Sequence, residues 1–241
     1  EIRRDSKAVN VHFGGDVYVQ PKPNGKLGVV AENETILRAV PYDTGMVGFE
    51  NGIVNTMRLW SVEIPSSEEG KYRSIEERRV FEDLTAVLYP DDSNARGRLI
   101  RLAQEYFFVS AGIQSIIRYF KKLNHPWHVL SEKVAIHIND THPALCIPEL
   151  MRILMDEYEV SWEQAWDLTS HTIMAEALEK WPTYLMKRSL PRMYQIIKEI
   201  DRRYVVSMSG IHDAALIERT RIIQGEEIHM ANLAIIGSHS T

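Results

Sequence analysis

Apolar and polar positions alternate most clearly at residues 134–138, where apolar side chains occupy every second position from Val134 to Ile138. This pattern predicts a short buried strand. The polar turn Asn139–Pro143 follows, and its proline can open a helix because the first helical turn does not use the missing N–H. Apolar residues then recur at helical spacing from Leu145 to Met155. In open α/β sheets ligands bind beyond the carboxyl ends of the strands, so this turn is a candidate functional site.

The pattern before residue 69 is that of an antiparallel β meander. The predicted strands are, in order, Val9–Phe13, Val17–Gln20, Leu27–Ala31, Thr35–Val40 and Asn55–Glu63. We expect a break at Gly14-Gly15 and a loop at Pro41–Gly45. A hairpin is expected at Pro23–Lys26, because its Asn-Gly supplies the positive φ values of a type I′ turn. Residues 1–68 are therefore predicted to be β-rich.

Residues 69–241 are predicted to be the α/β part of the chain. The predicted helices are Ile75–Val87, Leu99–Leu123 and Tyr184–Tyr204, the last interrupted at Pro191. Ser161–Gln164 has the sequence of a capping box and opens another short helix. Ala231–Ile236 is predicted to be a final buried strand. Strands and helices alternate after residue 85, which favours a parallel sheet and an α/β fold for residues 69–241.

The composition and charge limit the classes of protein to which this chain can belong. The 241 residues are 44% apolar and 25% charged, as in ordinary globular proteins, and the net charge of -5 gives no support for nucleic-acid binding. The single cysteine, Cys146, excludes an internal disulfide and suits a reducing compartment; in its apolar segment it is expected to be a buried small hydrophobe. No apolar run approaches a membrane span of roughly 18 residues. We expect a cytoplasmic protein with neither nucleic acid nor membrane as partner, and no metal site, because no Cys/His set has zinc spacing.

A long stretch then carries a resemblance. Ala135–Leu145 reads Ala-Ile-His-Ile-Asn-Asp-Thr-His-Pro-Ala-Leu, runs into Ile147–Arg152 and resembles the glycogen/starch (α-1,4-glucan) phosphorylases. Similar segments occur elsewhere in the chain, in the order in which the family has them: Ala39–Thr44, Val54–Ser61, Leu88–Asp92, Glu176–Pro182 and Gly237–Ser240. The resemblance implies the later part of the N-terminal half of a bacterial-type phosphorylase. That half is a Rossmann-like lobe of a GT-B glucosyltransferase fold. Because family members are far longer, we expect residues 1–241 to be a fragment, a partial N-terminal domain.

The resemblance also implies an activity. The family splits a terminal α-1,4-glucose from glycogen, starch or maltodextrin with inorganic phosphate, giving glucose 1-phosphate with retention. Its pyridoxal phosphate is bound through a lysine of the C-terminal half, whose motif is absent from this sequence. We therefore expect the chain to supply one wall of the active-site cleft and to be inactive alone. The alternatives are a non-catalytic glucan-binding module or a dimerising module derived from a phosphorylase.

Asp140 and His142 lead the candidate site residues. A polar pair at a strand end most simply caps its own turn. The resemblance instead implies that both line the pocket beside the glucosyl site, where a carboxylate and an imidazole suit sugar hydroxyls. Glu179 matches a carboxylate of the inner pocket, although a charged residue on an amphipathic helix is usually solvated.

His171 matches the family histidine whose main-chain carbonyl faces the glucose ring, where it can stabilise developing positive charge. Without the resemblance, His171 is simply a histidine at the N-terminus of a helix. The chain departs from the family here, because Trp166–Ser170 leads directly into His171. Family members have several more residues at this point, including Tyr-Thr-Asn.

The segment Tyr89–Ser93 resembles the mobile gate over the active site. Asp92 matches an acid near the substrate phosphate, and Ser93 stands where animal enzymes have asparagine. Arg101 matches the arginine partner of the gate. The simpler alternative is a helix-capping turn.

Three further residues and one helix concern regulation and assembly. Arg118 matches the first of two arginines that bind an activating nucleotide in regulated animal enzymes, but Tyr119 takes the second place, so we expect no nucleotide activation. Asp43 and Arg58 match positions near that region, with an internal ion pair as the alternative. The Ile75–Val87 helix resembles the family's tower helix and predicts a homodimer, whereas a solvated helix with i,i+4 charge pairs is the alternative.

Overall fold

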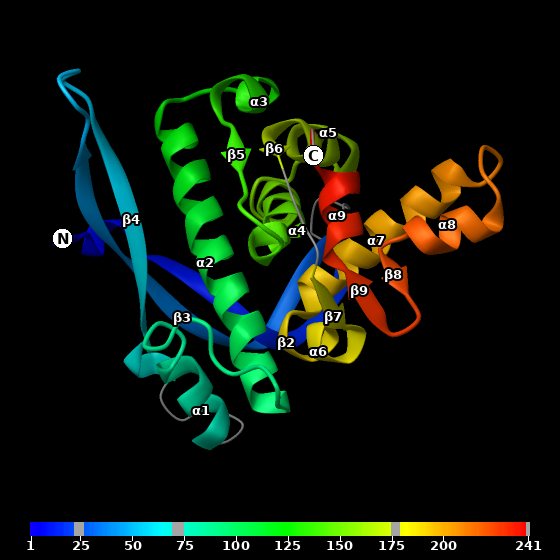
Figure 1. Ribbon diagram of the computed structural model, residues 1–241, viewed down its shortest axis with the longest axis horizontal. Coiled ribbons are helices and arrows are strands. Elements are labelled where there is room, and N and C mark those ends of the chain that lie inside the picture. The colour runs from blue at the N-terminus through cyan, green and yellow to red at the C-terminus, as the bar shows by residue number, and fades with distance from the viewer. Residues whose placement is uncertain (22–26, 69–74, 175–178, 240–241) are drawn as a thin grey trace. The chain divides into compact units, whose positions relative to one another are not determined.

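The computed structural model describes residues 1–21, 27–68, 75–174 and 179–239, and the chain forms two compact units. The first comprises Glu1–Phe13 and Glu34–Ser115, and the second comprises Gly14–Asn33 and Ile116–Thr241. Three elements run through both units: β2 (Val9–Pro21), β3 (Leu27–Val47) and the long helix α2 (Ala95–Lys122), which are labelled in Figure 1.

The first unit contains the predicted antiparallel sheet. β3 pairs with β4 (Val54–Glu63) from Arg38↔Glu63 to Val47↔Val54, and with the short β1 (Ile2–Arg3); β2 is its other neighbour. β4 confirms the predicted strand Asn55–Glu63. The alternating burial of Val9, Val11 and Phe13 places one face of β2 in the core.

Two predicted interruptions of this sheet are wrong. β2 continues through Gly14-Gly15, because both glycines adopt positive φ values, +65° and +82°, and bend the strand without ending it. Pro41–Gly45 is part of β3, where a loop was predicted. Proline has no N–H to donate to a neighbouring strand. Pro41 is nevertheless tolerated, because on the side of β3 that faces the Arg4 segment only its carbonyl is used, accepting a hydrogen bond from the Arg4 amide at 2.9 Å. The predicted hairpin Pro23–Lys26 lies outside the described residues.

Helix α1 (Ile75–Glu82) is shorter than the predicted helix Ile75–Val87. Gln104 on α2 accounts for the early end: its buried side-chain amide donates to the carbonyls of Leu84 and Val87, at 3.0 and 2.6 Å. These carbonyls are thereby held in a turn instead of a continuing helix. α2 confirms the predicted long helix and begins four residues earlier, at Ala95.

The second unit is mixed α/β. Its strands are β5 (Ile136–His137), β6 (Ile173–Met174), β7 (Lys180–Pro182), β8 (Ile223–Gln224) and β9 (Glu227–His229). Its helices are α3 (Leu130–Lys133), α4 (Cys146–Arg152), α5 (Trp162–Thr172), α6 (Thr183–Ser189), α7 (Pro191–Met208), α8 (Ala214–Thr220) and α9 (Met230–Gly237). A 3₁₀ turn, His142–Leu145, precedes α4, and a π-helical turn, Ile153–Glu157, follows it. The α/β class is confirmed, but the predicted parallel sheet is a single pair, β5–β6, among the described strands, and β7–β9–β8 is antiparallel.

Local sequence chemistry explains several boundaries. Ser161 caps α5 as predicted, its hydroxyl accepting from the Gln164 amide at 3.3 Å. Pro191 opens α7 after the non-helical Leu190, which confirms the predicted interruption. Of the predicted strand at residues 134–138, only β5 is a strand. The burial pattern is as expected, because Ile136 and Ile138 are buried and His137 between them is exposed.

The predicted final strand Ala231–Ile236 is wrong, because these residues form α9. Met230, Leu233, Ala234 and Gly237 are buried at helical spacing, whereas Ile235 is exposed. A short apolar run is compatible with either a strand or a buried helix. None of the helices among the described residues has the length and apolarity needed to cross a membrane.

The free thiol of Cys146 is expected to be inert in the native protein. Cys146 is buried on α4, and burial raises the pKa of its thiol to about 12. Because the thiolate is the reactive form, an aromatic disulfide reagent at neutral pH should label no thiol in the native chain and one thiol per chain in guanidinium chloride. Rapid labelling of the native protein would contradict the buried placement.

Candidate functional site

Two parallel strands end at the same edge of the second unit. β5 pairs with β6 through Ile136↔Ile173 and His137↔Met174, and the Ile138 amide donates to the Met174 carbonyl at 3.0 Å. The candidate turn therefore leaves β5 beside the end of β6. Ligands bind at such carboxyl edges in α/β proteins.

Asp140 shapes this turn. Its φ is +66°, a region that aspartate tolerates better than most residues. One carboxylate oxygen, Oδ1, accepts from the amide of Thr141 at 2.6 Å and from its hydroxyl at 3.1 Å. The other oxygen, Oδ2, lies 3.8 Å from His142 Nε2. Asp140 thus caps its turn through one oxygen and faces His142 with the other, so the capping interpretation and the pocket interpretation are compatible.

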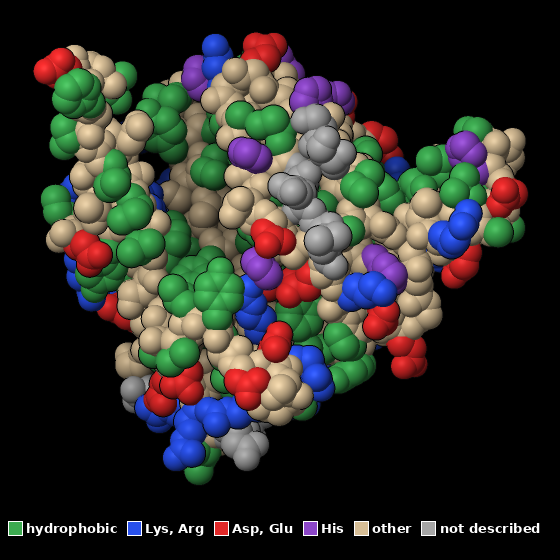
Figure 2. All heavy atoms as spheres, in the orientation of Figure 1, with side chains coloured by type: hydrophobic (Ala, Val, Ile, Leu, Met, Phe, Trp, Pro, Cys, Tyr) green, Lys and Arg blue, Asp and Glu red, His purple; other side chains and the backbone are tan. Residues whose placement is uncertain are grey.

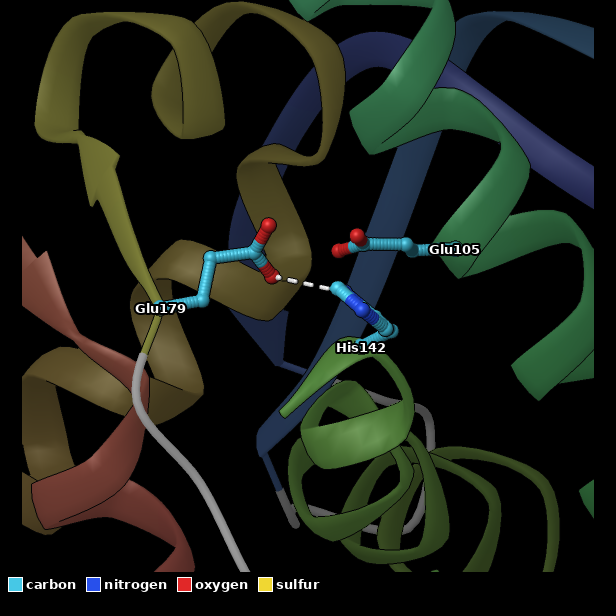
Figure 3. Close-up of side chains that lie close together, drawn as sticks. All are labelled: Glu105, His142 and Glu179. Carbon is cyan, nitrogen blue, oxygen red and sulfur yellow. Dashed lines mark ion pairs between the residues drawn. The ribbon is translucent and has the colours of Figure 1, made fainter. Parts of the chain in front are cut away.

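His142 lies between two carboxylates. Its Nδ1 is 3.5 Å from Oε2 of Glu179, and Figure 3 shows the two side chains pointing toward each other, from the 3₁₀ turn and from the chain just before β7. Asp140 is on the opposite ring nitrogen. At separations of 3.5–3.8 Å, a water or a ligand hydroxyl can bridge the groups. The three predicted residues Asp140, His142 and Glu179 are therefore brought together in one row.

His171 is placed differently from the sequence-based expectation. It lies in the last turn of α5, whereas a helix N-terminus was predicted. Its Nδ1 is 2.7 Å from the Asp167 carbonyl oxygen and 3.3 Å from Asp167 Oδ1, and its ring centroid is 6.1 Å from that of His239. The imidazole borders a depression of about 960 Å³ between α5 and α7 that also includes Trp166 and Arg203.

The gate-like segment belongs to the first unit. Arg101 on α2 stacks its guanidinium 4.7 Å from the ring centroid of Tyr89, which has a positive φ of 56°. The predicted pairing of Arg101 with this segment is thus present. Asp92 and Ser93 are exposed, and the turn is capped by Asp91, whose Oδ1 accepts from the Ser93 amide at 3.0 Å. That hydrogen bond lowers the pKa of Asp91.

Sequence reasoning missed Glu105, a buried carboxylate on α2. Its Oε1 lies 3.2 Å from Arg101 Nε. The i,i+4 spacing from Arg101 is the one feature of the sequence that could have identified it. The Arg101 guanidinium therefore contacts both the Glu105 carboxylate and the Tyr89 ring.

Asp43 and Arg58 form the internal ion pair expected as the alternative to an allosteric role. They are cross-strand neighbours in β3 and β4, and Arg58 donates to both carboxylate oxygens at 2.6 and 2.8 Å. Arg58 also donates to the hydroxyl of Ser115 at 2.8 Å. Its guanidinium holds the pKa of the buried Asp43 below its ordinary value. Arg118 lies in the second unit, on an exposed position of α2 beside the exposed Tyr119.

Comparison with known proteins gives one consistent family. A sequence model of the family described as carbohydrate phosphorylase matches residues 1–241. The chain is 44% identical over 249 residues to glycogen phosphorylase of Bacillus subtilis. It is 38% identical over 267 residues to the brain form of Rattus norvegicus and to the muscle form of Ovis aries. Each alignment covers 100% of the chain and 31% of the relative, so the chain spans about a third of the length of these relatives.

Proposed function

Since this chain belongs to the carbohydrate phosphorylase family, we propose that it forms part of an α-1,4-glucan phosphorylase. The intact protein cleaves a terminal glucose of glycogen, starch or maltodextrin with inorganic phosphate, giving glucose 1-phosphate with retention. This chain supplies one wall of the active-site cleft, as part of the N-terminal Rossmann-like lobe of a GT-B fold in the cytoplasm. The proposal rests mainly on the row of Asp140, His142 and Glu179 at the carboxyl edge of β5 and β6.

In this proposal the row binds sugar hydroxyls. Each hydroxyl is both a donor and an acceptor, so carboxylates accept from it while the imidazole donates or accepts. The capped turn of Asp140 supports this role, because its bonds to Thr141 fix the backbone that carries His142. Polar groups that are already held in their binding positions lose little conformational entropy when a ligand binds.

His171 contributes its main-chain carbonyl. The last carbonyls of a helix have no partner within the helix, and His171 lies in the last turn of α5. A carbonyl oxygen in that position can stabilise positive charge on the sugar at the point of cleavage. In the first unit, Asp92, Ser93 and Arg101 act in the gate, and the stacking of Arg101 on Tyr89 supports this assignment.

The described residues do not fit a site for pyridoxal phosphate. A lysine that forms a Schiff base is normally desolvated in a pocket. None of the described lysines is buried; Lys121 is half-buried, and the exposed ones are Lys7, Lys122, Lys133, Lys180, Lys187 and Lys198. We therefore assign cofactor binding, and with it the acid–base chemistry at the phosphate, to the two-thirds of the family protein that this chain does not span.

The family membership of the chain also leads to proposals on assembly and regulation. The intact protein is proposed to be a homodimer that uses helix α1, whose first residue Ile75 is exposed. Nucleotide activation is not expected, because Arg118 is followed by an exposed Tyr119 where a second arginine is needed to clamp a phosphate.

The first test uses the chain alone. Incubated with maltoheptaose, inorganic phosphate and pyridoxal phosphate, the purified chain should form no glucose 1-phosphate, whereas glycogen phosphorylase of Bacillus subtilis assayed in parallel should form it. Calorimetric titration with maltoheptaose should give negligible heat, because half of the cleft is missing. Turnover by the chain would refute the half-cleft proposal, and tight glucan binding without turnover would favour a non-catalytic binding module.

A further inference from the structure

The last turn of α5 and the chain just beyond α9 bring two histidines together in the second unit. The ring centroids of His171 and His239 lie 6.1 Å apart, and the ring planes meet at 36°. The backbone fixes this approach, because the His239 amide donates to the carbonyl of Ile173, directly after α5, at 2.7 Å. Figure 2 shows exposed histidine side chains at the top of the view, above the place where Figure 1 marks the C-terminus.

Hydrogen bonding decides which nitrogen of His171 can bind a metal ion. Nδ1 lies 2.7 Å from the carbonyl oxygen of Asp167. A carbonyl oxygen only accepts, so in the neutral imidazole Nδ1 carries the hydrogen and Nε2 carries the lone pair. Metal-binding histidines in proteins are oriented in the same way, by a carbonyl or a carboxylate at the other ring nitrogen. Asp167 supplies both groups, because its Oδ1 lies 3.3 Å from the same Nδ1.

The separation and exposure of the two rings suit one shared ion. A zinc ion lies about 2.0–2.1 Å from each imidazole nitrogen, so two rings on one ion have their centroids at most about 6.4 Å apart. The observed 6.1 Å is within this limit. Both histidines are exposed, and His171 borders the depression of about 960 Å³ between α5 and α7. An ion can therefore reach the pair and complete its coordination with water.

We propose that His171 and His239 form a binding site for a divalent transition-metal ion of the zinc or copper class. Imidazole nitrogen suits these ions, whereas Mg²⁺ and Ca²⁺ prefer oxygen ligands. Asp167 orients His171 from behind, and its negative charge attracts the cation. The two histidines are far apart in the chain, so no Cys/His spacing signals the site and a metal was not expected from the sequence. Ion binding by these side chains does not depend on the proposed function, which uses the main-chain carbonyl of His171.

Calorimetric titration of the full 241-residue chain with Zn²⁺ tests the site. One ion should bind per chain, and His239→Gln should weaken binding at least tenfold. Glutamine keeps the main-chain N–H that bonds to Ile173, and the side chain is exposed, so the fold should be retained, which circular dichroism will show. Electron paramagnetic resonance of the Cu²⁺-loaded chain should show two nitrogen ligands, and one in His239→Gln. His128→Gln, at another exposed histidine, is the matched control and should change neither measurement.

Three outcomes would overturn the metal site. The first is a chain that takes up neither Zn²⁺ nor Cu²⁺. The second is an affinity equal to that of the parent in either His171→Gln or His239→Gln. The third is binding that is lost in His142→Gln but kept in His239→Gln, which would place the ion at the row of Asp140, His142 and Glu179. These outcomes leave the proposed function untouched, because metal titration and glucan assays measure different properties.

Discussion

Replacing Asp201 by alanine is expected to lower the free energy of unfolding of the second unit by about 3–5 kcal/mol. Asp201 is a 2%-exposed carboxylate on α7. Its Oδ1 accepts from the amides of Ile222 and Ile223 at 2.7 and 3.0 Å, and its Oδ2 accepts from Arg221 at 2.6 Å. The same bond raises the pKa of the Arg221 guanidinium. Alanine leaves the two amides without this acceptor and removes the buried partner of Arg221, which keeps the exposed Glu218 carboxylate at 3.4 Å. The loss of the two amide acceptors and the buried ion pair costs far more than the loss of one surface contact.

Urea denaturation followed by circular dichroism measures this effect. Asp213→Ala is the matched control, because Asp213 is also an aspartate that accepts from a backbone amide, that of Leu216 at 2.7 Å, but at the exposed start of α8. Loss of an exposed helix cap costs about 1 kcal/mol. Equal destabilisation by the two variants would show that burial of the Asp201 network contributes nothing extra.

Replacing Gly97 by alanine is expected to destabilise the first unit by about 1–3 kcal/mol or more, because a Cβ there collides with the backbone. The added atom would lie 1.7 Å from the carbonyl oxygen of Asp91, and no side-chain rotation can relieve that overlap. Gly97 also donates its amide to Asn94 Oδ1 at 2.9 Å, so moving it disturbs the start of α2.

Gly112→Ala on the same helix is the control and should act in the opposite direction. Nothing lies within 4 Å of a Cβ added at Gly112, in the interior of α2. Alanine is favoured over glycine inside a helix by about 1 kcal/mol. Thermal melts of the two variants should therefore shift to opposite sides of the parent protein. A Gly97→Ala variant as stable as its parent would mean that residues 91–97 are not packed as described.

Local chemistry made the body of α2 and the starts of α5 and α7 predictable. The apolar spacing of α2, the hydroxyl of Ser161 and the ring of Pro191 each act within a few residues, so sequence alone identified these features. Longer-range contacts explain the errors. The end of α1 depends on Gln104, about twenty positions further along the chain, and Pro41 stays in β3 because of Arg4 on the neighbouring segment. For α9, the residues that are buried at helical spacing lie within a uniformly apolar run, so the sequence pattern does not distinguish a helix from a strand.

The candidate site could be predicted only in part. The polar turn after β5 follows from periodicity, so Asp140 and His142 were identifiable as strand-end residues. Their proximity to Glu179 depends on the parallel pairing of β5 and β6, which lie about 37 residues apart in the chain. Only the family resemblance predicted that Glu179 belongs to the same pocket. Spacing alone gave the wrong end of the helix for His171.

A chimera provides the most direct test of the claim that this chain is a cleft-forming third of a glucan phosphorylase. The matching segment of Bacillus subtilis glycogen phosphorylase is replaced by this chain, and glucose 1-phosphate formation from maltoheptaose and phosphate is measured. We predict an active chimera in which His142→Ala or Glu179→Ala lowers kcat/KM at least about tenfold, the cost of one buried polar contact. His128→Ala, at an exposed position, should leave it unchanged. A folded, cofactor-loaded chimera that is inactive, or one indifferent to His142→Ala, would contradict the account.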